Sequence, residues 1–251
     1  MVKISVVTVV KNGADTISTC IKSVQSQTIS VEHIIIDGGS TDRTLAIIEE
    51  YKSGIALVVS EPDNGIYDAM NKGLRLASGD VVGILNADDF YVDSGVLEKV
   101  ADVFADQEVD SCYGDLVFTD FKDTNRVFRY WRAGEFKSEK FQWGWMPPHP
   151  AFFARKEIYE QYGGFNVELG TAADYELMLR FLVKHSITTN YIPKVLVKMR
   201  MGGQSNATLY RRLVANRMDR KAWMVNGLKP YPWTLWMKPL RKIPQWWQRE
   251  L

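Results

Sequence analysis

The sequence predicts an α/β fold in which a Rossmann-like sheet, mixed but mostly parallel, is flanked by helices and followed by a basic helical tail. Short apolar runs alternate with segments of helical spacing through the first half of the chain. Polar loops follow these runs, and the segment 208–251 is rich in Lys, Arg and Trp. Strands that alternate with helices of this length form parallel sheets whose two faces are covered.

The first four apolar runs predict buried strands. These are expected at residues 3–10, 31–36, 56–59 and 81–85, with helices at 14–27, 41–52, 64–77 and 96–105. Right-handed crossovers place the carboxyl ends of such strands at one edge of the sheet. We therefore expect the polar loops that follow the four strands to meet at that edge and to form one site.

The pattern is less regular after residue 110. Strands are expected at 111–120, 126–131, 187–192 and 195–201, helices at 156–162, 171–184 and 211–225, and a Pro-rich, non-helical loop at 143–150. We predict one globular domain over residues 1–207, with halves at 1–110 and 111–207, and a tail over 208–251.

The composition excludes several classes of protein. The chain has 251 residues, of which 46% are hydrophobic and 24% charged, as in ordinary globular proteins. No run approaches the roughly 20 apolar residues of a membrane span, and the first residues lack the pattern of a signal peptide. Cys20 and Cys112 are too few for a disulfide framework. We therefore expect a protein of the reducing cytoplasm, with both cysteines in its core.

The net charge of +1 hides an asymmetry between the tail and the rest of the chain. Residues 208–251 hold ten Lys or Arg and two acids, a charge of +8, whereas the rest has 21 bases against 28 acids, a charge of −7. Five of the eight Trp also lie in the tail. Trp and cations suit an anionic membrane surface, which would place the protein peripherally at the inner face of the cell membrane. The alternatives are a tail packed on the acidic body and an oligomer contact; the negative body argues against nucleic acid as a partner.

The segment Asn86-Ala87-Asp88-Asp89 closes the apolar run 81–85. Adjacent carboxylates repel one another unless a cation joins them. Hard divalent cations take oxygen ligands and are often shared with substrate phosphates. The pattern indicates a metal-assisted site for a phosphorylated substrate, although a solvated turn with a helix cap fits this tetrapeptide equally well.

Two further stretches carry unusual polar residues. Asp37 ends a strand, where its carboxylate can accept a hydrogen bond from a base imide or a ribose hydroxyl, while Ser40 or Thr41 can cap the next helix. Three glycines at fixed spacing, as in a dinucleotide fingerprint, are absent there. In the stretch 60–73, Asp63 lies in a loop and Lys72 in a helix, where it can contact a phosphate or remain a solvated charge.

Taken in order, these stretches resemble family 2 glycosyltransferases of the nucleotide-sugar-binding A-type fold. The resemblance covers about residues 3–205 and is carried by segments 5–12, 36–42, 61–73, 85–89, 149–153, 162–165 and 173–180. The longer segments resemble bacterial enzymes of capsule, colanic-acid and O-antigen (lipopolysaccharide) assembly. The resemblance makes 1–110 the nucleotide-binding half and 111–207 the acceptor half.

The resemblance implies a donor site. Its residues are Thr8, Asp37, Asp63, Lys72, Asn86, Ala87, Asp88 and Arg200. Thr8 and Asp37 would contact the nucleoside, with Asp37 on the uracil or its equivalent. Asp88 matches the last Asp of the family's Asp-any-Asp motif and would hold Mn²⁺ or Mg²⁺, with Asn86 in place of the first Asp. Arg200 would contact phosphate from a loop at 200–205 that closes over the donor.

The resemblance also implies a catalytic base and an acceptor side. Asp174 matches the base at the start of a helix, preceded here by Ala173 where the family often has Glu. A carboxylate at a helix N-terminus is stabilised in its charged form and can accept a hydroxyl proton. Asp89, His149 and Trp145 are expected on the sugar or acceptor side, with His149 as a second candidate metal ligand. Without the match, Asp174 is an ordinary first-turn acid.

The implied function is inverting transfer of a hexosyl or N-acetylhexosaminyl group. The donor would be a nucleotide-diphosphate sugar, expected to be a UDP-sugar, and the acceptor a hydroxyl of a glycan or of a polyprenyl-diphosphate-linked sugar. A nucleotidyltransferase would need a Gly-rich basic first loop, and a nicotinamide oxidoreductase would need its glycine fingerprint. A non-catalytic sugar-nucleotide-binding or scaffold protein stays open, because Ala173 and Asn86 depart from the family's pattern.

Overall fold

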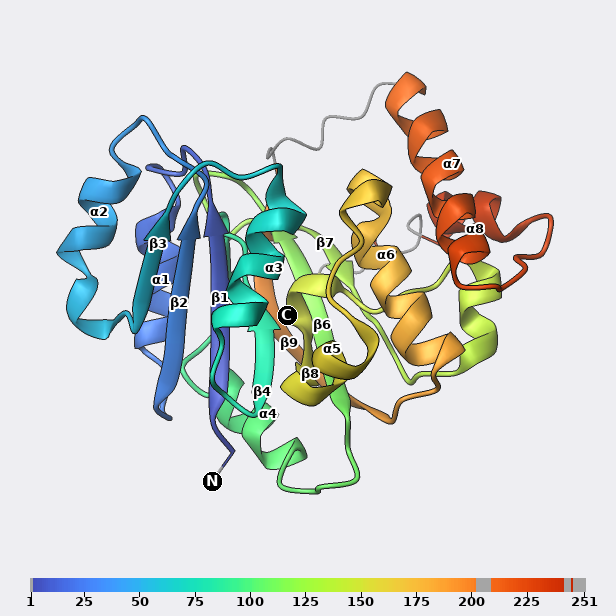
Figure 1. Ribbon diagram of the computed structural model, residues 1–251, viewed down its shortest axis with the longest axis horizontal. Coiled ribbons are helices and arrows are strands. Elements are labelled where there is room, and N and C mark those ends of the chain that lie inside the picture. The colour runs from blue at the N-terminus through green and yellow to red at the C-terminus, as the bar shows by residue number, and fades with distance from the viewer. Residues whose placement is uncertain (1, 202–208, 242–244, 246–251) are drawn as a thin grey trace.

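A single curved sheet organises the protein (Figure 1). The computed structural model describes residues 2–201, 209–241 and 245. Neighbouring strands follow the order β3-β2-β1-β4-β8-β6-β9-β5, and β7 pairs with β6. The strands are β1 (Ile4–Val10), β2 (Val31–Asp37), β3 (Leu57–Ser60), β4 (Val81–Ile84), β5 (Asp89–Tyr91), β6 (Ser111–Thr119), β7 (Val127–Trp131), β8 (Phe152–Arg155) and β9 (Thr189–Arg200).

Helices cover both faces of this sheet. They are α1 (Ile17–Gln25), α2 (Thr44–Glu50), α3 (Ile66–Leu76), α4 (Val96–Val103), α5 (Lys156–Tyr162), α6 (Ala173–Met178), α7 (Leu209–Val225) and α8 (Thr234–Leu240). Short 3-10 segments include η2 (Ser138–Trp143), η3 (His149–Ala151) and η4 (Val167–Ala172), and α6 continues into a π-helical turn at Leu179–Lys184. The mixed α/β fold with flanking helices is the predicted one.

The strand directions create a rim of loops. β1 runs parallel to β2 and β4, and β2 parallel to β3. β8 is antiparallel to both β4 and β6, and β9 is parallel to β6. Six strands therefore end at the same edge, and the chain enters α3 and the η4–α6 segment from that edge (Figure 1). Loops after β1, β2, β3 and β4 meet there, as the sequence predicts.

Several element predictions need correction. The two strands expected at 187–192 and 195–201 form one strand, β9, whose register against β6 jumps from the pair Gly114–Ile192 to the pair Asp115–Val195. Pro193 lies in this irregularity, because a proline has no amide hydrogen for the ladder. The short strands β5 and β8 escaped prediction, since each has only three or four residues and gains its pairing from distant strands.

The core occupies both faces of the sheet. One apolar cluster joins the β1 and β2 residues Val7 and Ile34 to Met70 of α3 and to the buried face of α6. A second cluster on the opposite face includes Cys20 and Cys112, both free and buried as predicted. This burial from both sides fixes the strands that deliver the rim loops.

The described part of the tail packs on the body. Trp223 of α7 is buried, and its indole Nε1 donates to the Tyr175 hydroxyl at 2.9 Å. Asn226 Nδ2 donates to Glu176 Oε1 at 3.0 Å, and Thr234 Oγ1 donates to the Gln142 carbonyl at 2.7 Å. The packing alternative therefore holds for these residues. The predicted boundary at 207/208 and most of the loop 200–205 lie outside the described residues.

Across the described ranges, every helix is too short or too polar to cross a bilayer.

Folding buries His33 of β2 as a neutral side chain. Burial lowers the pKa of His33 from 6.5 to about 4, and its Nε2 lies 3.0 Å from Thr8 Oγ1. In the unfolded chain His33 becomes protonated near pH 6.5, whereas in the folded protein it stays neutral until about pH 4. The stability that is present above pH 6.5 is therefore lost as the pH falls toward 4. We expect the free energy of unfolding to drop by about 3 kcal/mol over this range. Urea unfolding of the wild type and His33→Gln at several pH values measures this loss, and an equal loss in both proteins would contradict it.

Candidate active site

Backbone pairing holds the acidic cluster at the rim. Beyond β4, the Leu85 amide donates to the Val7 carbonyl at 2.9 Å and the Ala87 amide to the Val9 carbonyl at 3.2 Å. The Asp89 amide then donates to the Asn86 carbonyl at 3.0 Å, which turns the chain into β5. The segment 86–89 is therefore fixed between β1 and β9 before any ligand binds.

The two carboxyl groups of this segment differ in exposure. Asp88 is partly exposed, whereas Asp89 is fully buried. Burial raises the pKa of both groups, and the negative charge of Asp88 raises the pKa of Asp89 further. Arg200 partly offsets both shifts, because its Nη1 donates to the Asp88 carbonyl at 2.9 Å and its charge lies close to the carboxylates.

Two oxygens beside these carboxylates lack partners. Asn86 Nδ2 donates to Asp89 Oδ2 at 3.3 Å, but Asn86 Oδ1 and Asp89 Oδ1 are buried and accept no hydrogen bond from the described residues. Buried oxygens without partners cost free energy unless a ligand satisfies them. Asp89 was expected to face the sugar or acceptor. Its side chain is buried beside Asn86 and Arg200 in this structure, and that contact stays a prediction.

Asp37 occupies the same rim two strands away, roughly 10 Å along the sheet. Its Oδ2 accepts from the Ser40 amide at 3.0 Å and from Ser60 Oγ at 2.7 Å, which joins the ends of β2 and β3. Its Oδ1 is buried and has no partner among the described residues. The carboxylate is therefore rigidly held with one acceptor atom unused.

The loop after β3 lies against Asp37's loop. Asp63 Oδ1 accepts from the Gly65 amide at 3.0 Å, and a Cβ on Gly38 would lie only 2.1 Å from Asp63 Oδ2. Lys72 of α3 binds this loop, since its Nζ lies 2.9 Å from Glu61 Oε1 and donates to the Pro62 carbonyl at 3.1 Å. Hydrogen bonding to Glu61 raises the pKa of Lys72. Lys72 is therefore engaged with the protein in this structure.

Two predicted site residues lie in the core. Thr8 is fully buried, and its hydroxyl lies beside His33 and Cys20 on the side of β1 that faces α1. Trp145 is also buried, with its Nε1 donating to the Ala133 carbonyl at 2.8 Å and its ring against Tyr113 and Phe141. Nucleoside contact by Thr8 and acceptor contact by Trp145 stay predictions, and in this structure both side chains point into the core.

Asp174 lies in the first turn of α6 and interacts electrostatically with His149 and Tyr67. Burial lowers the pKa of His149, and the Asp174 charge opposes that shift. Burial raises the pKa of Tyr67, and the negative charge of Asp174 raises it further. Phe165 packs against both partners, with its ring centroid 5.5 Å from that of Tyr67 and 5.3 Å from that of His149. His149 belongs to η3, which contacts β4, and the β4–β8 register, with Gly83 opposite Phe153, places η3 at the end of β4 from which segment 86–89 continues.

The sequence interpretation missed Tyr67 and Phe165 as parts of the site. Both lie within the motif segments 61–73 and 162–165, so a signal was present. The contact between those segments was not predictable from either one. Asn71 joins the two segments, because its Nδ2 donates to the Phe165 carbonyl and its Oδ1 accepts from the Phe165 amide, each at 2.8 Å.

Arg180 fixes the other side of this segment. Its guanidinium pairs with Glu176 at 2.9 Å and donates to the carbonyls of Gly163 at 2.7 Å and Gly164 at 2.6 Å, as well as to that of Tyr162. Glu176 is only 3% exposed and also accepts from Asn226 of the tail. The start of α6, the turn before Phe165 and the tail are therefore tied together.

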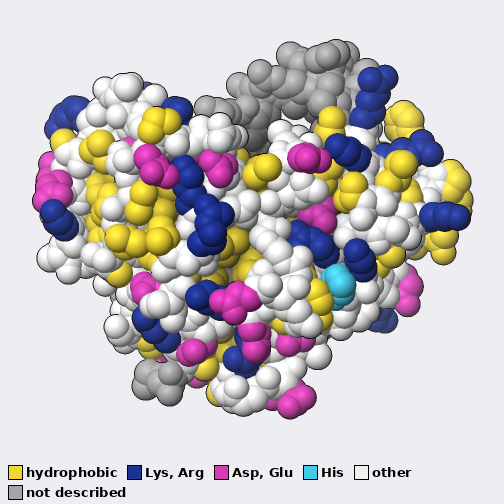
Figure 2. All heavy atoms as spheres, in the orientation of Figure 1, with side chains coloured by type: hydrophobic (Ala, Val, Ile, Leu, Met, Phe, Trp, Pro, Cys, Tyr) yellow, Lys and Arg dark blue, Asp and Glu magenta, His cyan; other side chains and the backbone are white. Residues whose placement is uncertain are grey.

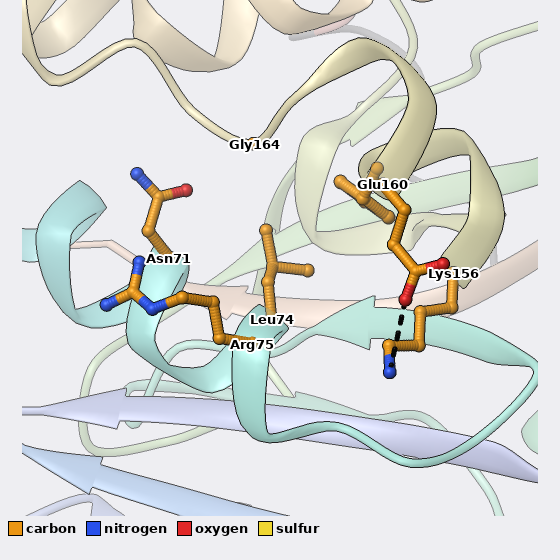
Figure 3. Close-up of a pocket in the computed structure, with 7 residues that line it drawn as sticks. Asn71, Leu74, Arg75, Lys156, Glu160 and Gly164 are labelled. Atoms are coloured by element: carbon orange, nitrogen blue, oxygen red, sulfur yellow. Dashed lines mark ion pairs between the residues drawn. The ribbon is translucent and has the colours of Figure 1, made fainter.

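A surface hollow lies between α3 and α5 (Figure 3), and residues 86–89 are not part of its lining. It is lined by Asn71, Leu74, Arg75, Lys156, Tyr159, Glu160 and Gly164. Lys156 and Glu160, one turn apart on α5, form an ion pair at 3.3 Å along its wall. None of these residues was predicted for the site, and Asn71 is already committed to Phe165, so we do not include the hollow in the candidate site.

Comparison with known proteins defines the class to which this fold and rim belong. The model of the family described as "Glycosyl transferase family 2" matches residues 5–163. A PGL/p-HBAD biosynthesis glycosyltransferase of Mycobacterium bovis (strain BCG / Pasteur 1173P2) is 30% identical over 201 residues, covering 78% of this chain and 76% of the relative. The chain belongs to glycosyl transferase family 2.

Solved structures agree on the fold. S. aureus TarS 1-349 in complex with UDP-GlcNAc has a TM-score of 0.66 at 18% identity, with 86% of this chain and 65% of that chain covered. The mannosyltransferase PcManGT from Pyrobaculum calidifontis, in complex with GDP-Man and Mn²⁺, has a TM-score of 0.67 at 18% identity, with 100% and 76% covered. The fold is the glycosyltransferase A-type fold.

The buried pair Glu176–Arg180 gives a stability prediction. Arg180→Met leaves an uncompensated buried carboxylate and removes three carbonyl contacts, so the free energy of unfolding should fall by about 3–5 kcal/mol. Lys156→Met is a matched control, because the Lys156–Glu160 pair has the same spacing but Glu160 is 64% exposed. The control should lose less than about 1 kcal/mol. Chemical denaturation measures both, and equal losses would show that the Arg180 cluster is not special.

Proposed function

We propose that this protein is an inverting glycosyltransferase that transfers a hexosyl or N-acetylhexosaminyl group from a UDP-sugar to an acceptor hydroxyl. The observation that carries the proposal is the position of Asp174. It lies in the first turn of α6 and acts on His149 of η3, which sits at the end of β4 where segment 86–89 begins, while Asp37 lies on the same rim. This supports a base at Asp174 that would act close to a diphosphate bound at segment 86–89, as a displacement reaction requires.

The donor nucleotide would bind between the loops after β2 and β3. Asp37 Oδ1 is the unused acceptor there, suited to a uracil imide. Asp63 would line the same pocket, with Lys72 supporting its loop and contacting phosphate only after release from Glu61. TarS in complex with UDP-GlcNAc supports a nucleotide-sugar ligand for this fold.

The residues after β4 fit a hard divalent cation. Asp88 offers a partly exposed carboxylate, and the buried Asn86 Oδ1 and Asp89 Oδ1 are oxygens that lack partners among the described residues. No three His, Cys, Asp or Glu side chains cluster as a metal site within residues 2–201, 209–241 and 245. Asp88 would therefore hold Mn²⁺ or Mg²⁺ together with the diphosphate, with Ala87 and Asn86 shaping the approach. When bound, the ion would neutralise charge on the departing diphosphate. The Mn²⁺ complex of PcManGT supports this proposal.

His149 has a different part. It is buried, and its interactions are with Asp174 and Phe165. We therefore favour a role beside the base over the second metal-ligand role that the sequence suggested. Its burial favours the neutral imidazole, which can hydrogen-bond the acceptor or Asp174 without adding charge.

The reaction is a single displacement. Asp174 accepts the proton of the acceptor hydroxyl as its oxygen forms a bond to the anomeric carbon. The bond from that carbon to the diphosphate oxygen breaks on the opposite face, and its electron pair leaves with the nucleoside diphosphate. Arg200, which already holds the Asp88 carbonyl, would contribute positive charge near the diphosphate.

The proposed acceptor class rests on the family resemblance. The relatives include a PGL/p-HBAD biosynthesis glycosyltransferase and a chondroitin synthase. We propose a hydroxyl of a polyprenyl-diphosphate-linked glycan in bacterial surface polysaccharide synthesis, capsule or lipopolysaccharide, on the cytoplasmic side of the membrane. The second candidate is a non-catalytic sugar-nucleotide-binding protein, favoured by Asn86 and Ala173. Release of nucleoside diphosphate from a UDP-sugar separates the two.

Removing the base should separate chemistry from binding. We expect Asp174→Asn to lower transfer by at least about 100-fold, because the amide cannot accept the proton. The dissociation constant for UDP should stay within about twofold, since Asp174 is placed on the acceptor side. Glu168→Gln, at an exposed acid of η4, is the control. Turnover of Asp174→Asn near that of the control would remove Asp174 from the mechanism.

Divalent metal should strengthen donor binding through Asp88. We expect Mn²⁺ to tighten UDP binding in the wild type, and Asp88→Asn to weaken that metal-dependent gain by about tenfold or more. Asp93→Asn, an exposed acid beyond β5, should retain it. Calorimetry with and without EDTA provides the readout. If the metal dependence survives intact in Asp88→Asn, the ion binds elsewhere.

A further inference from the structure

The tail exposes large aromatic side chains on a well-anchored base. Trp236 is 69% exposed, Tyr231 49% and Trp233 44%, and Trp143 of the body, 46% exposed, packs on Trp233 with centroids 5.9 Å apart. With the half-exposed Leu240 of α8, these residues form what we call the aromatic patch. Contiguous exposed apolar surface of this kind marks an interaction site.

The patch is held in place by buried polar contacts. Gln142 of η2 accepts from the Tyr231 amide at 2.8 Å and donates to the Lys229 carbonyl at 3.1 Å. Thr234 is fully buried and bonded to the Gln142 carbonyl. A Cβ on Gly144 would lie 2.5 Å from the Lys238 nitrogen, so α8 packs directly on the turn after η2. The rings are therefore displayed outward from a fixed backbone.

The surface around the patch is cationic. Arg217, Arg220 and Lys221 of α7 and Lys229 of the linker are exposed. The acid between residues 209 and 241, Asp219, is buried and lies 2.6 Å from Lys238 Nζ. Figure 2 shows dark blue and yellow side chains gathered together over α7, α8 and their linker at the right of the molecule.

We propose that the aromatic patch and its surrounding cations dock this protein on an anionic phospholipid bilayer. Trp and Tyr rings enter the headgroup region, while Lys and Arg contact lipid phosphates. A protein interface would place few charged side chains at its core and is particularly poor in Lys, whereas here cations adjoin the rings. The inference concerns a surface apart from Asp174 and the rim, so it does not depend on the proposed reaction.

Vesicle binding by the full-length protein tests the proposal. The protein should co-sediment with vesicles of phosphatidylcholine and phosphatidylglycerol. A much smaller fraction of it should co-sediment with vesicles of phosphatidylcholine alone. Added salt should weaken binding, because the cations are exposed. Trp233→Ser/Trp236→Ser and, separately, Arg220→Glu/Lys221→Glu should each lower the partition coefficient by about tenfold or more. Leu45→Ser/Leu57→Ser, which alters similarly exposed apolar residues on α2 and β3, should bind like the wild type.

Three outcomes would overturn the proposal. One is no sedimentation with anionic vesicles, and another is equal binding by all three double variants. The third is self-association of the wild type, measured by light scattering, that the Trp variant abolishes while vesicle binding is weak in both; the patch would then join two copies of the chain. The variant Arg220→Glu/Lys221→Glu changes only exposed side chains. Its vesicle binding therefore still tests the proposal if the Trp variant folds poorly. UDP-sugar turnover with a water-soluble acceptor, measured on the same variants, separates this failure from failure of the proposed function.

Discussion

The reciprocal hydrogen bonds between the Asn71 side chain and the Phe165 backbone are the contact on which the site depends. They join α3, which follows the donor-side loop, to the turn that precedes Asp174 in the second half of the chain. Phe165 then packs between Tyr67 and His149, and Arg180 anchors the carbonyls just before it. A side-chain amide that satisfies both groups of one peptide segment fixes position and orientation together. The proposed acceptor side is thereby positioned against the proposed donor side.

The rim carries buried acidic groups whose charges and oxygens are only partly compensated by the protein. Asp37, Asp88 and Asp89 lie at strand ends where burial raises the pKa of the latter two, and Asp37, Asn86 and Asp89 each keep one oxygen without a partner in the described part of the protein. A site that served stability alone would satisfy these groups internally. The sheet supplies the rigidity that holds them, since β1 and β9 flank the segment and Arg200 is bonded to its backbone. This arrangement suits a ligand that brings positive charge and hydrogen-bond donors.

The tail serves the body as well as the surface. Trp223 and Asn226 donate hydrogen bonds to Tyr175 and Glu176 of α6, so the helix that carries Asp174 is supported by the tail. The same segment turns Trp233 and Trp236 outward. One stretch of sequence therefore supports the helix of the proposed base and presents a cationic, aromatic surface, which couples the proposed chemistry to a defined side of the molecule.

Local sequence determined the parallel sheet, the meeting of the loops after β1 to β4, and the acidic segment 86–89, because apolar periodicity and strand-end polarity are written in neighbouring residues. The sequence motifs also identified the glycosyltransferase family. Only the tertiary structure decided that Thr8 and Trp145 point into the core and that Asp89 is buried, since a motif gives a residue's place in the chain and not the direction of its side chain. It alone decided that β9 is one strand, that Asp174 lies beside Tyr67 and His149, and that Trp223 is buried while Trp236 is exposed. Several of those outcomes depend on partners distant in sequence, such as Tyr175 for Trp223, 48 residues away, which no local pattern specifies.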